Sequence, residues 1–71
     1  MSMVETVRHG LPTEGRTIPE LCRLFGVDSE FKMMRIIAEL ECSGDATIDD
    51  FDKIYREDGG AIYLAKYKRK S

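Results

Sequence analysis

Three segments in the first part of the chain carry apolar residues at helical spacing. In the first, Val4, Val7 and Leu11 follow an S-x-x-E sequence, which is typical of a capped helix start. This pattern predicts a short helix over about residues 3–9, with a strand as the alternative, because isolated helices of this length are marginal in water. Gly10 ends the pattern.

The second segment has the clearest helix start. Thr17 and Glu20 form a second capping box, and Pro19 falls in the first turn, where its missing N–H costs nothing. Gly26 is placed to adopt the left-handed conformation that ends a helix. The apolar side of the predicted helix consists of Leu21, Cys22, Leu24 and Phe25.

The third segment predicts a longer helix over about residues 29–42, capped by Asp28 or Ser29 and ended by Gly44. Apolar residues at i, i+3, i+4 and i+7 form a stripe that should face the core: Met33, Ile36, Ile37 and Leu40. The apolar neighbours expected to broaden this stripe are Phe31, Met34 and Ala38. The opposite side, which should face solvent, holds Lys32, Arg35 and Glu39.

The second half of the chain has a less regular pattern. Residues 45–58 are ambiguous, because their apolar positions fit helical spacing while the β-branched pair at Thr47 and Ile48 favours a short strand. Gly59 and Gly60 predict a turn. The alternating residues 61–68 then predict a strand, with Ile62, Leu64 and Lys66 on one face and Tyr63, Ala65 and Tyr67 on the other.

The composition is that of a small folded protein. Of the 71 residues, 42% are hydrophobic and 34% are charged, which is ordinary for one globular domain over residues 1–71. No apolar run approaches the roughly 20 residues that a membrane helix needs. The N-terminus lacks the apolar segment of a signal peptide, so the default expectation is a cytoplasmic protein.

The net charge is −2, but the charged residues are distributed unevenly along the chain. Residues 36–60 hold two basic and eight acidic side chains, a balance of −6, whereas residues 61–71 hold four basic side chains and no acidic one. Such segregation indicates that different faces meet different partners. The basic residues 68–71 are expected to form a frayed tail.

The order helix, glycine turn, helix, glycine-rich turn and strand resembles the winged helix-turn-helix family. The match is carried by Cys22–Val27, Leu40–Ala46 and Gly59–Leu64, and it covers about residues 17–67. The resemblance implies a small α+β, winged-helix-like domain of three helices followed by a short β-hairpin, the wing. Its parts would be an N-terminal helix and connector (1–16), the helix-turn-helix (17–42), the wing region and strand (45–67), and the tail (68–71).

This resemblance implies binding to double-stranded DNA and a role as a transcriptional or replication accessory regulator. A helix fits the major groove, and its outward side chains reach base edges. On the third predicted helix the candidates are Ser29, Lys32 and Arg35, with solvated surface charges as the alternative interpretation. Phosphates would be neutralised by Lys66, Lys68, Arg69 and Lys70. Small modules of this kind often bind as dimers, so a homodimer is one expectation.

The acidic wing region departs from the family pattern and supports a second hypothesis. Its carboxylates would repel phosphates if they lay on the binding side, and acidic faces recruit basic partners. The residues concerned are Asp49, Asp50, Asp52, Glu57 and Asp58. In this alternative, the domain is a protein-interaction module for a basic protein and does not bind DNA.

The sequence predicts neither an enzyme, nor a cofactor, nor a metal site. Two cysteines and one histidine cannot supply a closed four-ligand zinc site in a monomer. The aspartates from Asp45 onward fail the EF-hand spacing, because its glycine and glutamate positions hold Asp50 and Arg56. Cys22 and Cys42 are expected to be reduced thiols in or near the core.

Overall fold

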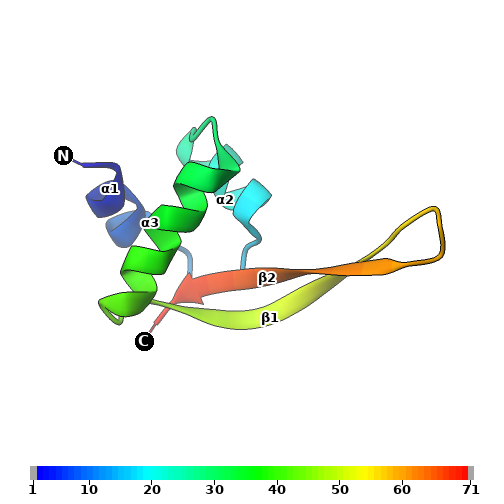
Figure 1. Ribbon diagram of the computed structural model, residues 1–71. Coiled ribbons are helices and arrows are strands. Elements are labelled where there is room, and N and C mark those ends of the chain that lie inside the picture. Colours follow the sequence, from blue (N-terminus) through cyan, green and yellow to red (C-terminus); the bar gives the residue numbers. More distant parts are fainter. Residues whose placement is uncertain (1, 71) are drawn as a thin grey trace.

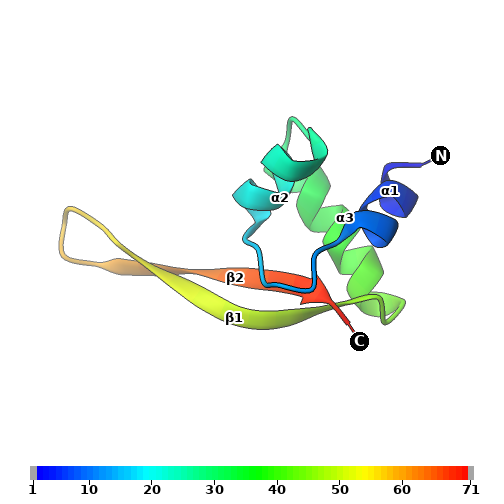
Figure 2. The same cartoon turned by 180° about the vertical axis from the view of Figure 1, so that it is seen from behind.

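Three helices precede a two-stranded antiparallel sheet in the computed structural model, which describes residues 2–70 (Figure 1). The elements are α1 (Met3–Gly10), α2 (Ile18–Phe25), α3 (Glu30–Cys42), β1 (Ala46–Tyr55) and β2 (Ala61–Arg69). This order confirms the predicted α+β domain of three helices followed by a hairpin. Helices α1 and α2 lie on the same side of α3, as the front and back views show (Figures 1 and 2).

Each helix begins at a side chain that the sequence marked as a cap. The Ser2 hydroxyl accepts a hydrogen bond from the Glu5 amide, and the Ser29 hydroxyl accepts one from the Lys32 amide. At α2, the Thr17 amide and hydroxyl both donate to the Glu20 carboxylate, at 3.1 and 3.0 Å. These two bonds lower the pKa of Glu20.

The turn between α2 and α3 depends on Gly26. Its φ of 68° is in the left-handed region, which an L-amino acid occupies only at a cost. The backbone then turns, and the Val27 amide donates to the Cys22 carbonyl at 2.9 Å. This geometry ends α2 and sets the direction from which α3 starts.

The core lies where the three helices and the base of the hairpin meet. Its buried apolar residues are Val7, Leu11, Leu21, Met33, Ile36, Ile37, Leu40 and Ala46. The prediction that the α3 stripe would widen was wrong, because Phe31 is 68% exposed, Met34 is 57% exposed, and Ala38 is also exposed. Leu24 on α2 is likewise exposed. The reason is that α3 is covered by helices on one side only, so apolar residues beyond that side meet solvent.

A β-bulge explains why residues 45–58 resembled a helix. β1 pairs with β2 in a regular antiparallel register except between Ile48 and Asp50, where Asp49 is the extra residue. The insertion places Ile48 and Phe51, three positions apart, on the same face of the sheet. The helical alternative for this segment was therefore wrong, and the strand alternative is correct.

The two faces of the hairpin differ in chemistry. Residues paired directly across two strands share a face, so the register assigns every side chain outside the bulge. The face that contacts the helices, here called the aromatic face, carries Ile48, Phe51, Lys53, Tyr55, Tyr63, Ala65 and Tyr67. The opposite face, here called the acidic face, carries Asp50, Asp52, Ile54, Ile62, Leu64 and Lys66.

The prediction of a frayed tail was wrong for residues 68–70. Lys68 and Arg69 belong to β2, where they pair with Thr47 and Ala46. The Arg69 amide donates to the Pro12 carbonyl at 2.8 Å, so the connector between α1 and α2 also holds this end. Ser71 lies outside the described residues.

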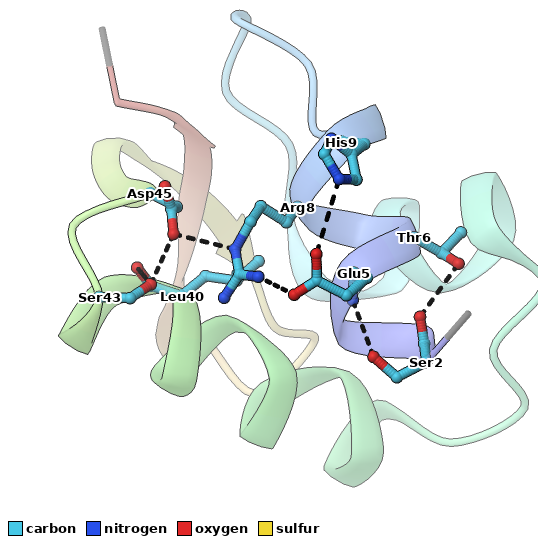
Figure 3. A network of polar contacts seen from close by, with 8 residues as sticks. All are labelled: Ser2, Glu5, Thr6, Arg8, His9, Leu40, Ser43 and Asp45. Carbon is cyan, nitrogen blue, oxygen red and sulfur yellow. Dashed lines mark hydrogen bonds and ion pairs between the residues drawn. The ribbon is translucent and has the colours of Figure 1, made fainter.

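A polar network fixes α1 to the corner between α3 and β1 (Figure 3). The Arg8 guanidinium donates to the carboxylate of Asp45 at 3.0 Å and also contacts Glu5. The Ser43 hydroxyl donates to the same Asp45 carboxylate at 2.7 Å. The hydrogen bond from Ser43, and then that from Arg8, lowers the pKa of Asp45.

Candidate nucleic-acid interface

The predicted residues of α3 divide into a capping residue and two exposed cations. The Ser29 hydroxyl caps the helix, so its hydrogen-bonding capacity is partly used within the fold. Lys32 is 66% exposed and makes an ion pair with the exposed Asp28 at 3.2 Å. Arg35 is exposed, and within residues 2–70 its guanidinium has no carboxylate within 4.0 Å. Both cations line a shallow depression together with Met3 and Val27, on the flank of α3 that is turned away from the hairpin.

The basic residues of the last strand do not form one free patch. Lys66 and Lys68 are half-buried, and they make ion pairs with Asp52 at 3.7 Å and with Asp49 at 3.4 Å. Arg69 donates through its guanidinium to the backbone carbonyl of His9. Lys70 is exposed.

Lys32 and Lys70 lie at opposite ends of α3. Lys32 is in the first turn of α3, whereas the Lys70 amide bonds to the Asp45 carbonyl, just beyond the last turn. A helix of 13 residues is about 20 Å long. Lys32 and Lys70 are therefore separated by about one helix length.

The acidic residues of the hairpin also fall into separate groups. Asp49 and Asp52 form ion pairs with Lys68 and Lys66 of β2. Asp50 and Asp52 lie on the acidic face, which is turned away from the helices. Asp58 lies in the turn, where it pairs with Arg56 and accepts a hydrogen bond from the Gly60 amide. The carboxylates therefore do not form one continuous surface, and they are absent from the aromatic face.

The aromatic face is the feature that the sequence interpretation missed. Phe51, Tyr55 and Tyr63 are more than half exposed there. The ammonium group of Lys53 lies 4.9 Å from the ring centre of Tyr55 and 5.8 Å from that of Tyr63. Alternation of apolar residues on either side of Asp49 was the signal, but it is visible only if the bulge is known.

A notch marks the inner angle between the hairpin and the helices. It is lined by Ile18 and Pro19 of α2, Met34 of α3, and the β2 residues Tyr63 and Tyr67, with further contributions from Glu30, Leu64 and Ala65. The notch is continuous with the aromatic face, because Tyr63 belongs to both. Together they form an apolar surface shaped like the inside of a letter L.

The two cysteines occupy different environments. Cys22 is half-buried, and burial raises the pKa of its thiol; its sulfur donates to the Ser29 carbonyl at 3.7 Å. Cys42 is exposed, so its predicted place in or near the core was wrong. Within residues 2–70, no group of three or more His, Cys, Asp or Glu side chains is arranged to hold a metal ion.

Comparisons with known proteins provide no relative from which a role could be transferred. None of the helices in residues 2–70 has the length and apolar character required to cross a membrane. No family model matches the chain, and neither a curated protein nor a solved structure matches it.

Proposed function

We propose that the protein binds double-stranded DNA through α3, as a small winged-helix-like regulator. The observation that carries this proposal is the exposure of Lys32 and Arg35 on the second helix of a helix, glycine turn, helix unit. A guanidinium on such a helix pairs with the two acceptors of guanine in the major groove. The ammonium group of Lys32 suits a phosphate oxygen.

The ion pair of Lys32 does not remove it from this role. Lys32 and Asp28 are both exposed, and an exposed pair of this kind contributes little to stability in water. A phosphate can therefore replace Asp28 at small cost. The acidic residues of the hairpin also oppose DNA binding less than their number implies, since two are paired with lysines and the acidic face is turned away from the helices.

Titration of the chain against fluorescent duplex DNA tests the proposal. We expect binding that weakens steeply with salt, because each neutralised phosphate releases counterions and contributes about −0.9 to the slope of log affinity against log salt concentration. Replacement R35E should lower affinity more than tenfold, since a bidentate contact is worth about 1–3 kcal/mol and the new carboxylate repels phosphate. K32E should lower affinity for all sequences alike.

The matched control for R35E is R56E. Arg56 is also exposed and undergoes the same change of charge, but it lies next to the hairpin turn, away from α3. The R56E variant should keep most of the affinity of the wild type for duplex DNA. Absence of binding at low salt, or equal losses in R35E and R56E, would refute binding through α3.

A protein-interaction module is the second candidate, and the exposed apolar surface favours it. Monomeric proteins seldom expose large contiguous apolar patches, and such patches commonly mark interfaces. Here the aromatic face supports the hypothesis better than the scattered carboxylates do. If this candidate replaces DNA binding, the chain does not bind duplex DNA at any salt concentration, and F51E abolishes capture of the protein partner while R35E preserves it.

A further inference from the structure

We infer that the aromatic face and the notch form a docking surface for a second copy of this chain. In this arrangement, two L-shaped molecules interlock around a two-fold axis. The hairpin of each copy lies along the hairpin of the other, and each tip reaches the notch of its partner. The inference goes beyond DNA binding and does not depend on it.

The isolated chain leaves a large amount of apolar surface uncovered. Ile48, Phe51, Tyr55, Tyr63 and Met34 are between 42% and 74% exposed. A large aromatic side chain has about 150–250 Å² of surface. These five residues therefore present roughly 500–600 Å² of side-chain surface, while a stable interface buries about 800 Å² on each partner. They supply most of what a dimer needs.

One chain provides both halves of a complementary shape. The hairpin projects from the helices as an arm (Figures 1 and 2). The notch at the inner angle is a recess lined mainly by apolar residues. A two-fold interface requires a surface that is complementary to itself. An arm joined to a recess meets this requirement, because rotation by half a turn places each arm against the recess of the other copy.

The hairpin itself is exposed from residue 48 to residue 63. Residues 50–63, which we call the arm, are all exposed, although they include five large apolar or aromatic side chains: Phe51, Ile54, Tyr55, Ile62 and Tyr63. A two-stranded hairpin alone is at best marginally stable in water. A second hairpin laid on its aromatic face gives it the additional layer that a stable sheet needs.

This dimer leaves the α3 cations accessible. Lys32 and Arg35 lie on the flank of α3 next to Met3 and Val27, whereas the notch uses the flank of Met34 and Glu30. Self-association and DNA binding therefore use different sides of the helix. Loss of self-association can therefore be recognised while DNA binding persists, and loss of DNA binding while self-association persists.

Sedimentation equilibrium over a range of concentrations tests the inference. The wild-type chain should sediment as a dimer, with twice the 8.1 kDa of one chain. F51E and Y63E should each raise the dimer dissociation constant more than tenfold, because each buries a carboxylate in an apolar contact. The matched control is L24E, since Leu24 is 56% and Phe51 55% exposed, but Leu24 lies on α2 outside the surface. L24E should remain dimeric.

A second measurement uses only the wild-type chain, so it does not depend on how the variants fold. In a mixture of labelled and unlabelled protein, intermolecular nuclear Overhauser effects should connect the Tyr55 ring of one copy with the Met34 methyl group of the other. A monomeric wild type at all concentrations overturns the inference, even if it captures another protein. Intermolecular contacts confined to Leu24, or a dimer that F51E leaves intact, also overturn it.

Discussion

The helical body, residues 3–42, and the arm, residues 50–63, contain similar apolar side chains. Many of those in the body are buried, whereas those in the arm are exposed. In the body, Leu21, Met33 and Leu40 have no exposed surface, because α1 and α2 cover one side of α3. In the arm, residues 50–63 are all exposed, although both strands carry isoleucine and tyrosine and β1 also carries Phe51. A pattern of apolar residues therefore identifies a surface that is suited to burial, but other elements of the fold must supply the residues that bury it.

The body and the arm contribute differently to stability. Burial of apolar surface contributes about 25 cal/mol per Å², so the body supplies most of the stability of the isolated chain. The arm contributes little until something packs on it. Exposed apolar surface that does not stabilise the isolated chain is surface that is available to a partner.

The largest expected effect is a cavity in the body. Leu40→Ala should lower the free energy of unfolding by about 2–5 kcal/mol, because it removes a fully buried side chain from a small core. Ile54→Ala, on the acidic face of the arm, should cost about 1 kcal/mol or less, since its main loss is the cross-strand contact with Ile62. Urea denaturation followed by far-UV circular dichroism measures both values.

Both variants are compared at one protein concentration, because the stability of an associating chain depends on concentration. Equal losses of stability in Leu40→Ala and Ile54→Ala would contradict the difference between body and arm. They would mean that the arm is packed as firmly as the body.

The helical body was largely predictable from the sequence because its signals are local. Caps at Ser2, Thr17 and Ser29, the left-handed turn at Gly26, and the stripe through Met33 and Leu40 each act over a few residues. The width of the stripe was not predictable. It depends on how many helices cover α3, and that is a property of the tertiary arrangement.

The hairpin was harder to predict because one residue changes its pattern. The bulge at Asp49 turns strict alternation into a spacing of three, which imitates a helix. The same shift decides which face carries the carboxylates. The pairing of Lys66 and Lys68 with aspartates of β1 also depends on register, so a count of charges along the chain overstated both the basic and the acidic patch.

The next largest effect should come from the junction between body and arm. A Cβ atom at Gly15 would lie 2.6 Å from the Asp49 carboxylate oxygen and 3.1 Å from the Cβ atom of Lys66. Gly15→Ala should therefore push the connector away from the hairpin, at a cost of about 1–3 kcal/mol. Its nuclear magnetic resonance spectrum should show shifted amides at the base of the hairpin and unchanged amides in the middle of α3.

Gly60→Ala is the control for this junction. Its added Cβ would meet only the flexible side chains of Asp58 and Arg56, at 3.2 Å and beyond, in the turn at the tip of the hairpin. It should change stability by about 0.5 kcal/mol or less. A greater loss in Gly60→Ala than in Gly15→Ala would show that the tip, and not the base, holds the arm in place.

The smallest effect concerns the polar network that joins α1 to the corner between α3 and β1. The pKa of Asp45 is lowered below its usual 3.8, so its carboxylate stabilises the fold at neutral pH, and this contribution is lost as the pH falls through the lowered value. D45N should therefore melt at a lower temperature than the wild type at neutral pH, and the two should converge in strong acid.

Ser43→Ala separates the network from a general effect of charge. It removes the hydrogen bond that lowers the pKa of Asp45 most, so carbon-detected titration of that carboxyl group should show its pKa rising toward the usual value. The wild type and D45N should differ most where Asp45 is ionised. A difference that stays constant with pH, or that grows in acid, would mean that Arg8 holds α1 on the body without help from the Asp45 charge.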